Sequence, residues 1–249
     1  MNRKIAFFID GGYFKRRVTY FHRTFFDVDN FPLTPDALQS VLYRLVSKHK
    51  QDLERTDTYR IYYYDAPPFD GQYREPVPQN LEETCRTRNF KREPSVEFQK
   101  SFHSKLQSSR KLALRMGKLA NHKRWILNEE AQKKLIKGDI DVTNLSPSDF
   151  YLDVKQKGVD TRLGIDITTV TLRKFADTIV LMASDADFVP AAKLARTHGM
   201  DVVLDPLYGN VDQDLECHVD GKRSYDIVSI LKDTLQCEPS QRPNWWNRE

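Results

Sequence analysis

The stretch Lys4-Ile5-Ala6-Phe7-Phe8-Ile9-Asp10-Gly11-Gly12 is an apolar run that ends abruptly in an acid and two glycines. Residues 178–188 repeat this arrangement far downstream, where an apolar run meets Asp185 and Asp187. Apolar runs of this length that end in a turn are typical of buried strands in a parallel sheet. Because the carboxyl ends of parallel strands meet at one edge of the sheet, we expect these three acids to lie close together.

Strand-like and helix-like segments alternate on both sides of the middle of the chain. A helix is expected from Leu33, with Thr34 as its N-cap and Pro35 in its first turn. Helical spacing returns after Asp160. The further expected elements are strands at 59–64, 178–183 and 201–206 and helices at 188–198 and 227–235. This alternation predicts an α/β fold, a parallel sheet flanked by helices.

The middle of the chain is irregular, proline-containing and rich in charge. We expect one domain over residues 1–237 that contains a basic insertion at about 67–147, and a flexible C-terminal tail at 238–249. Within the insertion, short strands are expected at 110–117 and 123–127 and a helix at 128–136.

The charge of the chain is distributed unevenly. Residues 86–137 hold 15 Lys or Arg against four Asp or Glu, whereas the rest of the chain holds 24 basic and 31 acidic residues. Such a basic segment is either a solvated face or a surface that binds a polyphosphate backbone. Trp125 either stacks a base or packs in a core. The residues expected to contact nucleic acid are Lys111, Arg115, Lys118, Lys123, Arg124, Trp125 and Lys157.

Two further acids, Asp160 and Asp166, lie in the helix that begins after Gly158. Six helical residues turn through about 600°, which leaves the two side chains roughly 120° apart around the helix axis. Asp160 is therefore expected to point towards the strand ends, while Asp166 is the weaker candidate and is equally compatible with a solvated or capping role. For Asp10, Asp185 and Asp187, the alternative role is to cap the following helix.

Three or four carboxylates that converge on one point repel one another unless a cation lies between them. Oxygen ligands of this kind suit Mg²⁺ or Mn²⁺. Such an ion could bind a scissile phosphate and lower the pKa of an attacking water, while a nearby carboxylate accepts the proton. We therefore expect a metal site formed by Asp10, Asp160, Asp166, Asp185 and Asp187.

These motifs together resemble the NYN family, in the LabA-like branch of the PIN-like nucleases. The resemblance lies in Ile9 to Tyr13, in Lys157-Gly158-Val159-Asp160 and in the segment from Ala183 to Pro190. It implies a PIN-like Rossmannoid sheet and metal-dependent cleavage of RNA, with Asp10, Asp160 and Asp185 as catalytic carboxylates and Asp166 and Asp187 in support. The chain departs from the family pattern at Gly12, Ala183 and Ala186.

The sequence thus favours a ribonuclease, more specifically an endoribonuclease, that acts on single-stranded or tRNA-like RNA. Two alternatives stay open: a non-catalytic module that binds nucleic acid or a partner, and a structure-specific DNA nuclease. A second copy of the chain or a regulatory protein is a further candidate partner. The chain lacks Gly-x-Gly-x-x-Gly and Walker-type motifs, which argues against dinucleotide and P-loop nucleotide binding.

The chain has no apolar run of 18 residues and no signal-peptide pattern. We therefore expect a cytoplasmic protein with no membrane contact. Its three cysteines, Cys85, Cys217 and Cys237, are widely spaced and are expected to be reduced.

Overall fold

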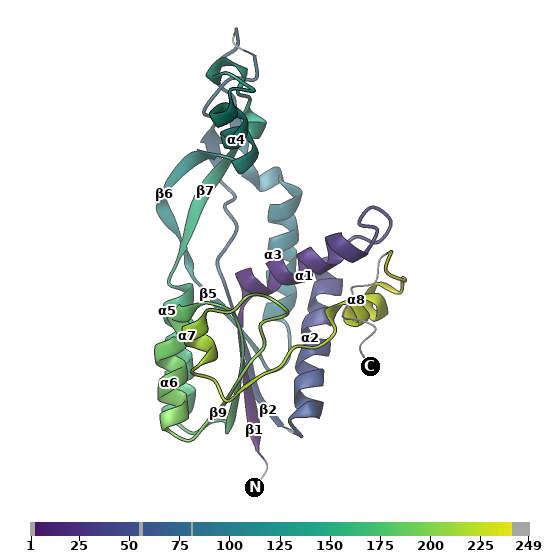
Figure 1. Ribbon diagram of the computed structural model, residues 1–249, viewed down its shortest axis with the longest axis vertical. Coiled ribbons are helices and arrows are strands. Elements are labelled where there is room, and N and C mark those ends of the chain that lie inside the picture. The colour runs from purple at the N-terminus through teal and green to yellow at the C-terminus, as the bar shows by residue number, and fades with distance from the viewer. Residues whose placement is uncertain (1–2, 55–56, 81, 241–249) are drawn as a thin grey trace. The chain divides into compact units, whose positions relative to one another are not determined.

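A six-stranded parallel sheet is the centre of a computed structural model that describes residues 3–54, 57–80 and 82–240 (Figure 1). The strand order is β10-β9-β8-β1-β2-β5, and every neighbouring pair is parallel. The strands are β1 (Lys4–Asp10), β2 (Asp57–Asp65), β5 (Leu112–Met116), β8 (Thr178–Met182), β9 (Asp201–Leu204) and β10 (Gly221–Lys222). The expected α/β fold, a parallel sheet flanked by helices, is confirmed.

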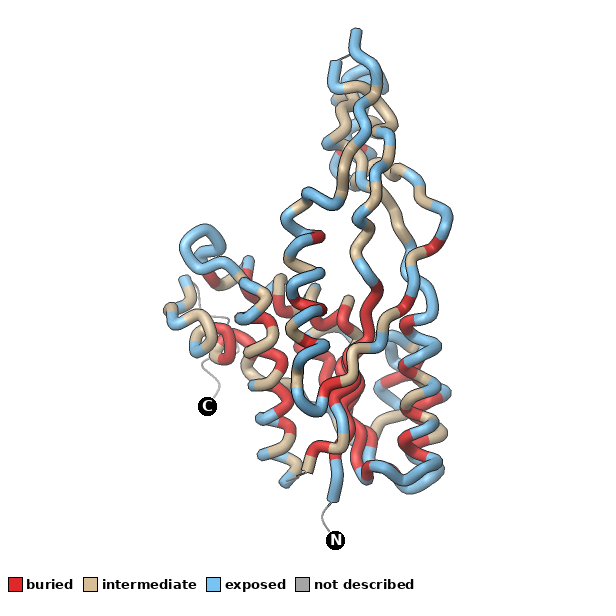
Figure 2. The backbone as a smooth tube through the Cα atoms, turned by 180° about the vertical axis from the view of Figure 1, so that it is seen from behind, coloured by how far each residue is buried: buried red, intermediate tan, exposed pale blue. Residues whose placement is uncertain are grey.

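The sheet belongs to a core unit that comprises the described residues up to Asp65, Ser101–Gly117, and those from Gly158 onward. Burial is concentrated along its strands and the helix faces that cover them (Figure 2). Ile5 to Ile9 are all fully buried, because helices cover both faces of β1. This explains why β1 is a continuous apolar run rather than an alternating one.

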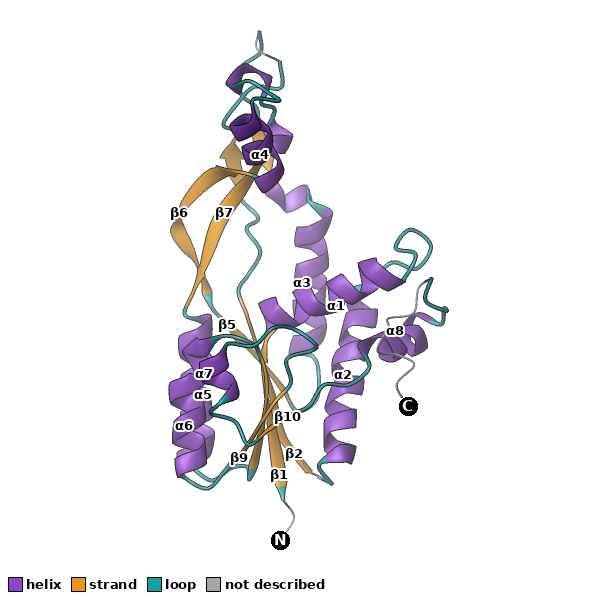
Figure 3. Ribbon diagram, viewed as in Figure 1, coloured by secondary structure: helices purple, strands orange, loops and turns teal. Residues whose placement is uncertain are grey.

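Helices cover both faces of the sheet (Figure 3). Tyr63 of β2 faces α1 (Gly11–Phe25), where its ring meets Phe14 edge-on, and the next residue, Tyr64, faces α5 (Val159–Leu172) and donates a hydrogen bond to Asp166. Consecutive strand residues point to opposite faces, so α1 and α5 lie on opposite sides. The other main helices of the core unit are α2 (Pro35–Asp52), α6 (Val189–Thr197), α7 (Gln213–Glu216) and α8 (Ile227–Leu235).

The sequence predictions and the observed helices differ most at α1, which was not expected. α2 begins where it was predicted to begin, with Thr34 accepting a hydrogen bond from the Ala37 amide and Pro35 in the first turn. α1 follows β1 without a loop and buries Phe14, Val18 and Phe21. These side chains recur at helical spacing, so the signal for α1 was present but masked by the two glycines with which the helix begins.

β5 falls within the stretch expected to be an insertion, yet it forms one edge of the central sheet. Leu112 pairs with Ile61 of β2, and Phe102 of α3 (Pro94–Gln107) is fully buried against Tyr63. The charged residues around β5 hid its role because an edge strand has only one strand neighbour and tolerates exposed side chains.

A second, hairpin unit comprises Ala66–Lys100 and Lys118–Lys157. It contains two antiparallel pairs, β3 (Gln72–Arg74) with β4 (Thr87–Asn89), and β6 (Lys118–Leu127) with β7 (Phe150–Lys157). The remaining elements are α4 (Glu129–Lys137) and three short 3₁₀ turns, η1 (Phe90–Arg92), η2 (Val142–Asn144) and η3 (Pro147–Asp149). The strand and helix expected at 123–127 and 128–136 are present, as parts of β6 and α4.

Most of the tail expected at 238–249 lies outside the described residues, which end at Ser240. Among the described residues, no helix is both long and apolar enough to span a bilayer. All three cysteines are free thiols.

Candidate active site

The two acid-tipped strands lie side by side at the point where the chain changes direction across the sheet. From β1 the chain continues to β2 and β5 on one side, and it later adds β8, β9 and β10 on the other. In open parallel sheets, ligands bind outside the carboxyl ends of the strands at such a switch point. Asp10 ends β1, and Asp185 follows the end of β8, so both acids flank this point.

Asp10 is half-buried and forms the N-cap of α1. Its Oδ1 accepts a hydrogen bond of 3.0 Å from the Tyr13 amide, which is the capping role that the sequence left open as an alternative. Burial raises the pKa of Asp10, while the Tyr13 amide and the Arg16 charge lower it only in part. Oδ1 is thus engaged in the capping hydrogen bond, and burial disfavours the charged form of the carboxyl group.

Gly11 makes the approach of α1 to the sheet possible. A Cβ at this position would lie 2.4 Å from Cε1 of Tyr63 and 2.6 Å from the carbonyl oxygen of Tyr64, closer than any side chain tolerates. The Tyr63 hydroxyl donates a hydrogen bond to the Gly11 carbonyl oxygen at 3.1 Å. Gly11 therefore fixes where α1 starts and, with it, the position of Asp10.

Asp160 lies in the first turn of α5 and is exposed. The helix begins after Gly158, whose φ of 75° is in the left-handed region that favours glycine. Partial burial raises the pKa of Asp160, and the negative charges of Asp10, Asp187 and Asp185 raise it further. The charges of three carboxylates thus act on that of Asp160. We call Asp10, Asp160, Asp185 and Asp187 the acid cluster.

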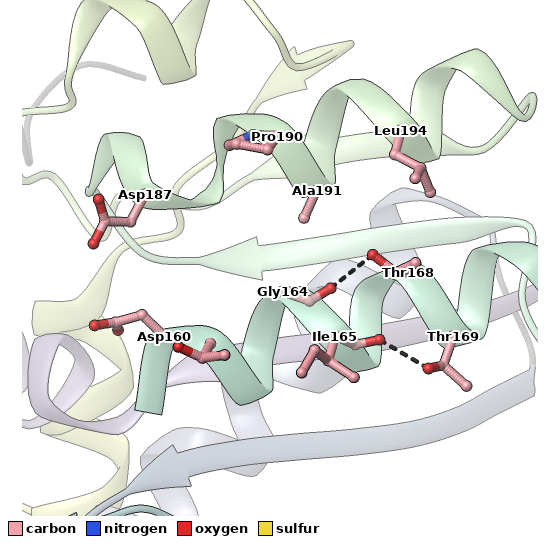
Figure 4. A pocket seen from close by; sticks show the side chains of 10 residues that line it. Asp160, Gly164, Ile165, Thr168, Thr169, Asp187, Pro190, Ala191 and Leu194 are labelled. Atoms are coloured by element: carbon pink, nitrogen blue, oxygen red, sulfur yellow. Dashed lines mark hydrogen bonds between the residues drawn. The ribbon is translucent and has the colours of Figure 1, made fainter. Parts of the chain in front are cut away.

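Asp185 and Asp187 lie on either side of Ala186, at the start of a single 3₁₀ turn, η4 (Ala186–Phe188). Both are exposed, and an Asp185 oxygen accepts a hydrogen bond of 3.1 Å from the Asp187 amide. Asp185 therefore has the capping contact that the sequence left open. Asp187 lies just before α6, at the same end of a groove as Asp160 of α5 (Figure 4).

Asp166 is not brought together with the acid cluster. Its carboxylate accepts two hydrogen bonds from the Arg115 guanidinium, at 2.9 and 3.0 Å, and one of 2.9 Å from the Tyr64 hydroxyl. This bidentate arrangement fixes the carboxylate firmly. Asp166 ties α5 to β2 and β5, so its contacts are those of a structural anchor.

Asp65, at the end of β2, is a site-flanking acid that the sequence reading missed. It is fully buried, with one carboxylate oxygen 2.7 Å from Nζ of Lys15 and 2.8 Å from Nε2 of His103. Burial raises the pKa of Asp65, but these two partners outweigh it and hold the pKa below its ordinary value. The signal was available, because Asp65 ends an aromatic strand just as Asp10 ends an apolar one.

Arg16 is a second residue that was missed. A Cβ built on Gly12 would lie 3.3 Å from Oδ1 of Asp10 and 3.5 Å from Nη1 of Arg16, so both groups flank Gly12. Arg16 is exposed and makes no salt bridge with any described residue. Its position six residues after Asp10 follows from the unexpected α1, and no sequence motif marks it. A free guanidinium beside a carboxylate cluster is well suited to hold a phosphate oxygen.

Two of the residues expected to contact nucleic acid belong to the core unit. Lys111 has a φ of 60° and donates a hydrogen bond of 2.8 Å from its ammonium group to the Thr58 carbonyl oxygen. Arg115 binds Asp166 and lies over the Tyr62 ring, 5.7 Å from its centroid. Both cations already have intramolecular partners.

The other five lie in the hairpin unit and fall into two groups. Lys118 and Lys157 are exposed and directly opposite each other in the β6–β7 register, and neither forms a salt bridge with any residue that the structure describes. Like charges that face each other across strands destabilise the pair, unless an anion lies between them. Arg124 is largely exposed, 3.4 Å from Asp153.

Trp125 and Lys123 are partly buried in the hairpin unit. The Trp125 indole donates a hydrogen bond of 2.7 Å to the Arg74 carbonyl oxygen, and its ring packs on Phe90 and Tyr73. Lys123 lies over the Phe69 ring, 5.1 Å from its centroid. These contacts match a small aromatic core that joins the two hairpins, the alternative that the sequence had left open for Trp125.

The acid cluster can be tested as a site for a divalent cation. Its donors are carboxylate oxygens, and their mutual repulsion is the field that a cation would relieve. Within the described part of the chain, no group of three or more His, Cys, Asp or Glu side chains is placed to surround one ion. The donor set therefore fits a hydrated Mg²⁺ or Mn²⁺, which keeps most of its waters and needs only one or two carboxylates directly.

Comparisons with known proteins relate this chain to a family of domains. The family model of the NYN domain matches residues 23–206, which include every acid of the cluster except Asp10. A crystal structure of a protein of unknown function from Vibrio parahaemolyticus is similar at 12% identity with a TM-score of 0.44, over 90% of this chain and 94% of that chain. Among curated proteins, no match to this chain was found.

Proposed function

Because this chain belongs to the NYN domain family of the PIN-like superfamily, we propose that it is a divalent-metal-dependent nuclease that hydrolyses RNA phosphodiester bonds in the cytoplasm. NYN domains are generally nucleases. We propose further that the chain belongs to the LabA-like branch and cuts within single-stranded or tRNA-like RNA. The observation that carries this proposal is the position of Asp10 and Asp185 at the ends of the neighbouring strands β1 and β8, at the switch point of the sheet. Burial and, after it, the charges of Asp10, Asp187 and Asp185 raise the pKa of Asp160, which supports the same site.

In this proposal, the acid cluster of Asp10, Asp160, Asp185 and Asp187 would hold a hydrated Mg²⁺ or Mn²⁺, with one or two of these carboxylates as direct ligands and the others bound to its waters. When bound there, such an ion supplies charge neutralisation at the scissile phosphate and a more acidic water. Asp10 is oriented by the Tyr13 amide, and one carboxylate of the cluster accepts the proton of the attacking water. Asp166 supports the site indirectly, because its bonds to Arg115 and Tyr64 hold α5 and therefore Asp160 in place.

The cations proposed to hold the substrate are those without strong intramolecular partners. Arg16 is next to Asp10 and would bind an oxygen of the scissile phosphate. In the hairpin unit, Lys118, Lys157 and Arg124 would contact RNA phosphates, which relieves the repulsion between the two facing lysines. Lys111, Arg115, Lys123 and Trp125 would support these surfaces from within.

The direct test is cleavage of end-labelled single-stranded RNA, tRNA and single-stranded DNA with Mg²⁺, Mn²⁺ or EDTA. We expect RNA cleavage with either metal, none with EDTA, and a loss of at least about 10²-fold in Asp10→Asn and Asp160→Asn, the scale for removing one electrostatic contact to a transition state. Asp233→Asn is the matched control, because Asp233 is an exposed acid on α8. Its activity should equal that of the wild type.

Two outcomes would contradict this proposal. If the folded wild type cuts DNA but not RNA under the same conditions, the chain is a DNA nuclease. If it cuts neither, and binds RNA equally well with Asp160→Asn, the chain is a binding module. In that second case, Lys118→Ala and Lys157→Ala should weaken binding and reduce its dependence on salt.

A further inference from the structure

A groove of about 560 Å³ runs between α5 and α6 and starts at the acid cluster (Figure 4). Asp160 and Asp187 stand at one end, on opposite sides of the groove. Further along, Gly164 of α5 and Ala191 of α6 line it. The groove volume lies in the range of about 300–1,000 Å³ that is typical of small-ligand sites. The groove is therefore a continuation of the candidate active site.

Gly164 keeps this groove open. Its position is in the interior of α5, where glycine destabilises a helix relative to alanine. A Cβ built on Gly164 would meet nothing within 4 Å, so close packing does not explain the glycine. The space in front of Gly164 is groove space, and the side chain across from it is only the methyl group of Ala191.

The walls of the groove are uncharged beyond its acidic end. Ile165, with 59% of its surface exposed, and Leu194 offer apolar surface, and no lysine or arginine among the described residues lines the groove. The hydroxyl groups of Thr168 and Thr169 donate hydrogen bonds to the helix carbonyl oxygens of Gly164 and Ile165, at 2.9 and 2.8 Å. Their oxygens keep lone pairs that can accept a hydrogen bond from a ligand.

The chemistry of the groove walls indicates which part of a nucleic acid the groove would bind. Beyond the acidic end, a phosphate would meet no cation of the described residues, so the groove does not favour the backbone of a nucleic acid there. A nucleoside is neutral, its base is flat and largely apolar on both faces, and base and sugar carry N–H and O–H donors for the threonine oxygens. A group of this kind, attached to a phosphate at the acid cluster, fits both the walls and the position of the groove.

We propose that the α5–α6 groove binds the nucleoside next to the scissile phosphate, which gives the proposed action on single-stranded RNA a structural basis. This proposal rests on the proposed nuclease function, since it takes the acid cluster as the place of cleavage. A paired base is stacked between its neighbours and cannot enter a groove between two helices unless it first leaves the duplex. The groove thus adds a requirement for single-stranded substrate that the carboxylates alone do not impose.

The test fills the groove from Gly164, where added atoms meet open space. Gly164→Ala and Gly164→Leu place a small and a large side chain in the groove, and Thr197→Leu, on an exposed position of α6 outside the groove lining, is the matched control. Each variant is assayed with Mn²⁺ on a single-stranded 12-mer RNA and on an oligomer of the same ribose–phosphate backbone without bases. Circular dichroism and thermal melting check that each variant is folded.

We expect kcat/KM on RNA to fall slightly in Gly164→Ala and at least about 10-fold in Gly164→Leu, which corresponds to about 1.4 kcal/mol. Cleavage of the base-free oligomer should be the same in both variants, in Thr197→Leu and in the wild type. Equal losses on both substrates, or no loss on RNA in Gly164→Leu, would overturn the proposal. So would a change from dimer to monomer in Gly164→Leu with unchanged RNA kinetics, which would assign the groove to contact between copies.

A binding measurement separates this proposal from the nuclease itself. Uridine and adenosine are titrated into ¹⁵N-labelled protein in EDTA, where no cleavage occurs. Shifts of the Gly164 and Ala191 amide resonances in the wild type, with the Ala191 shift lost in Gly164→Leu, would support the groove even if the wild type cleaves no RNA. No shift at millimolar nucleoside would overturn it even if the wild type is an active nuclease.

Discussion

The carboxyl ends of β1 and β2 are neighbours in the sheet, and each carries an aspartate, but the two acids differ in every other respect. Asp65 is fully buried and touches Lys15 and His103, which hold its pKa below the ordinary value. Asp10 forms no salt bridge with any described residue, and burial raises its pKa. Asp205 beyond β9 resembles Asp65, since it is buried and bonded to His49 and Ser224.

An acid at the end of a strand can therefore have different roles, depending on the groups that the fold places around it. Where the fold provides cations, as for Asp65, the carboxylate stabilises the protein and its charge is fully used within the chain. At Asp10 burial disfavours the charged carboxylate, and at Asp160 burial and the charges of the neighbouring acids do so together. Such carboxylates are left for an external cation. The paired acids and the acid cluster should therefore respond in opposite ways to substitution, metal and pH.

The largest expected effect is on stability at the paired end. Asp65→Ala leaves the partly buried ammonium group of Lys15 and the buried His103 without their anion, and should lower the free energy of unfolding by about 3–5 kcal/mol. Asp160→Ala removes a repelled charge and should leave this free energy unchanged or raise it. Urea unfolding in EDTA measures both. A comparable loss in Asp160→Ala would break the distinction.

The next effect comes from metal. At a Mn²⁺ concentration about 100 times the dissociation constant, the wild type should gain about 2.7 kcal/mol in free energy of unfolding. Asp160→Asn should lose most of this gain, whereas Asp166→Asn should keep it, because Arg115 and Tyr64 already engage Asp166. Urea unfolding in the presence of Mn²⁺ or of EDTA measures this gain for the wild type and both variants. The opposite pattern would make Asp166 the metal ligand.

The two kinds of acid should also titrate on opposite sides of the ordinary aspartate pKa. Without metal, the carboxyl ¹³C resonances of Asp10 and Asp160 should titrate above 3.8, and that of Asp65 below it. By linkage, the contribution of Asp160 to stability is present at low pH and lost as pH rises through its raised pKa. The contribution of Asp65 is present above 3.8 and lost as pH falls through its lowered pKa. A low pKa for Asp160 would contradict this.

The last prediction concerns Gly164, which, like the acid cluster, is expected to lower the stability of the protein. Gly164→Ala should raise the free energy of unfolding by about 0.5–1 kcal/mol, because a helix prefers alanine and the new methyl group meets nothing. Urea unfolding again measures the difference. A loss of stability would mean that Gly164 serves packing, and the comparison would then rest on the acids alone.

The sheet was predictable because its signals are local. Continuous apolar runs such as Ile5 to Ile9 are required wherever helices cover both faces of a strand, and Thr34 with Pro35 marks a helix start by its hydrogen-bonding chemistry. β5 was assigned to the insertion because an edge strand needs little apolar character. Its place is decided by pairing with β2, a contact between distant residues that leaves no pattern within β5.

The candidate site was predictable only in part, for a related reason. The strand-end rule places Asp10 and Asp185 at the switch point of the sheet. Asp166 was also expected among the metal ligands, whereas its carboxylate is bonded to Arg115 and Tyr64. The rule could not distinguish Asp10 from Asp65, because the partners Lys15 and His103 come from α1 and α3. Lys111 and Arg115 were also predicted to contact nucleic acid, although Lys111 is bonded to the Thr58 carbonyl oxygen and Arg115 to Asp166.

Gly11 and Gly164 look alike in the sequence but are held in place by different demands. At Gly11 the Tyr63 ring and the Tyr64 carbonyl oxygen leave no room for a Cβ, whereas at Gly164 a Cβ has free space. In a random library screened only for folded protein, position 11 should therefore remain glycine, while position 164 should drift towards alanine and larger residues. A second screen of the same library for activity would restore glycine at 164. The two glycines would then be retained for different reasons, Gly11 for the packing of α1 on the sheet and Gly164 for binding of the substrate.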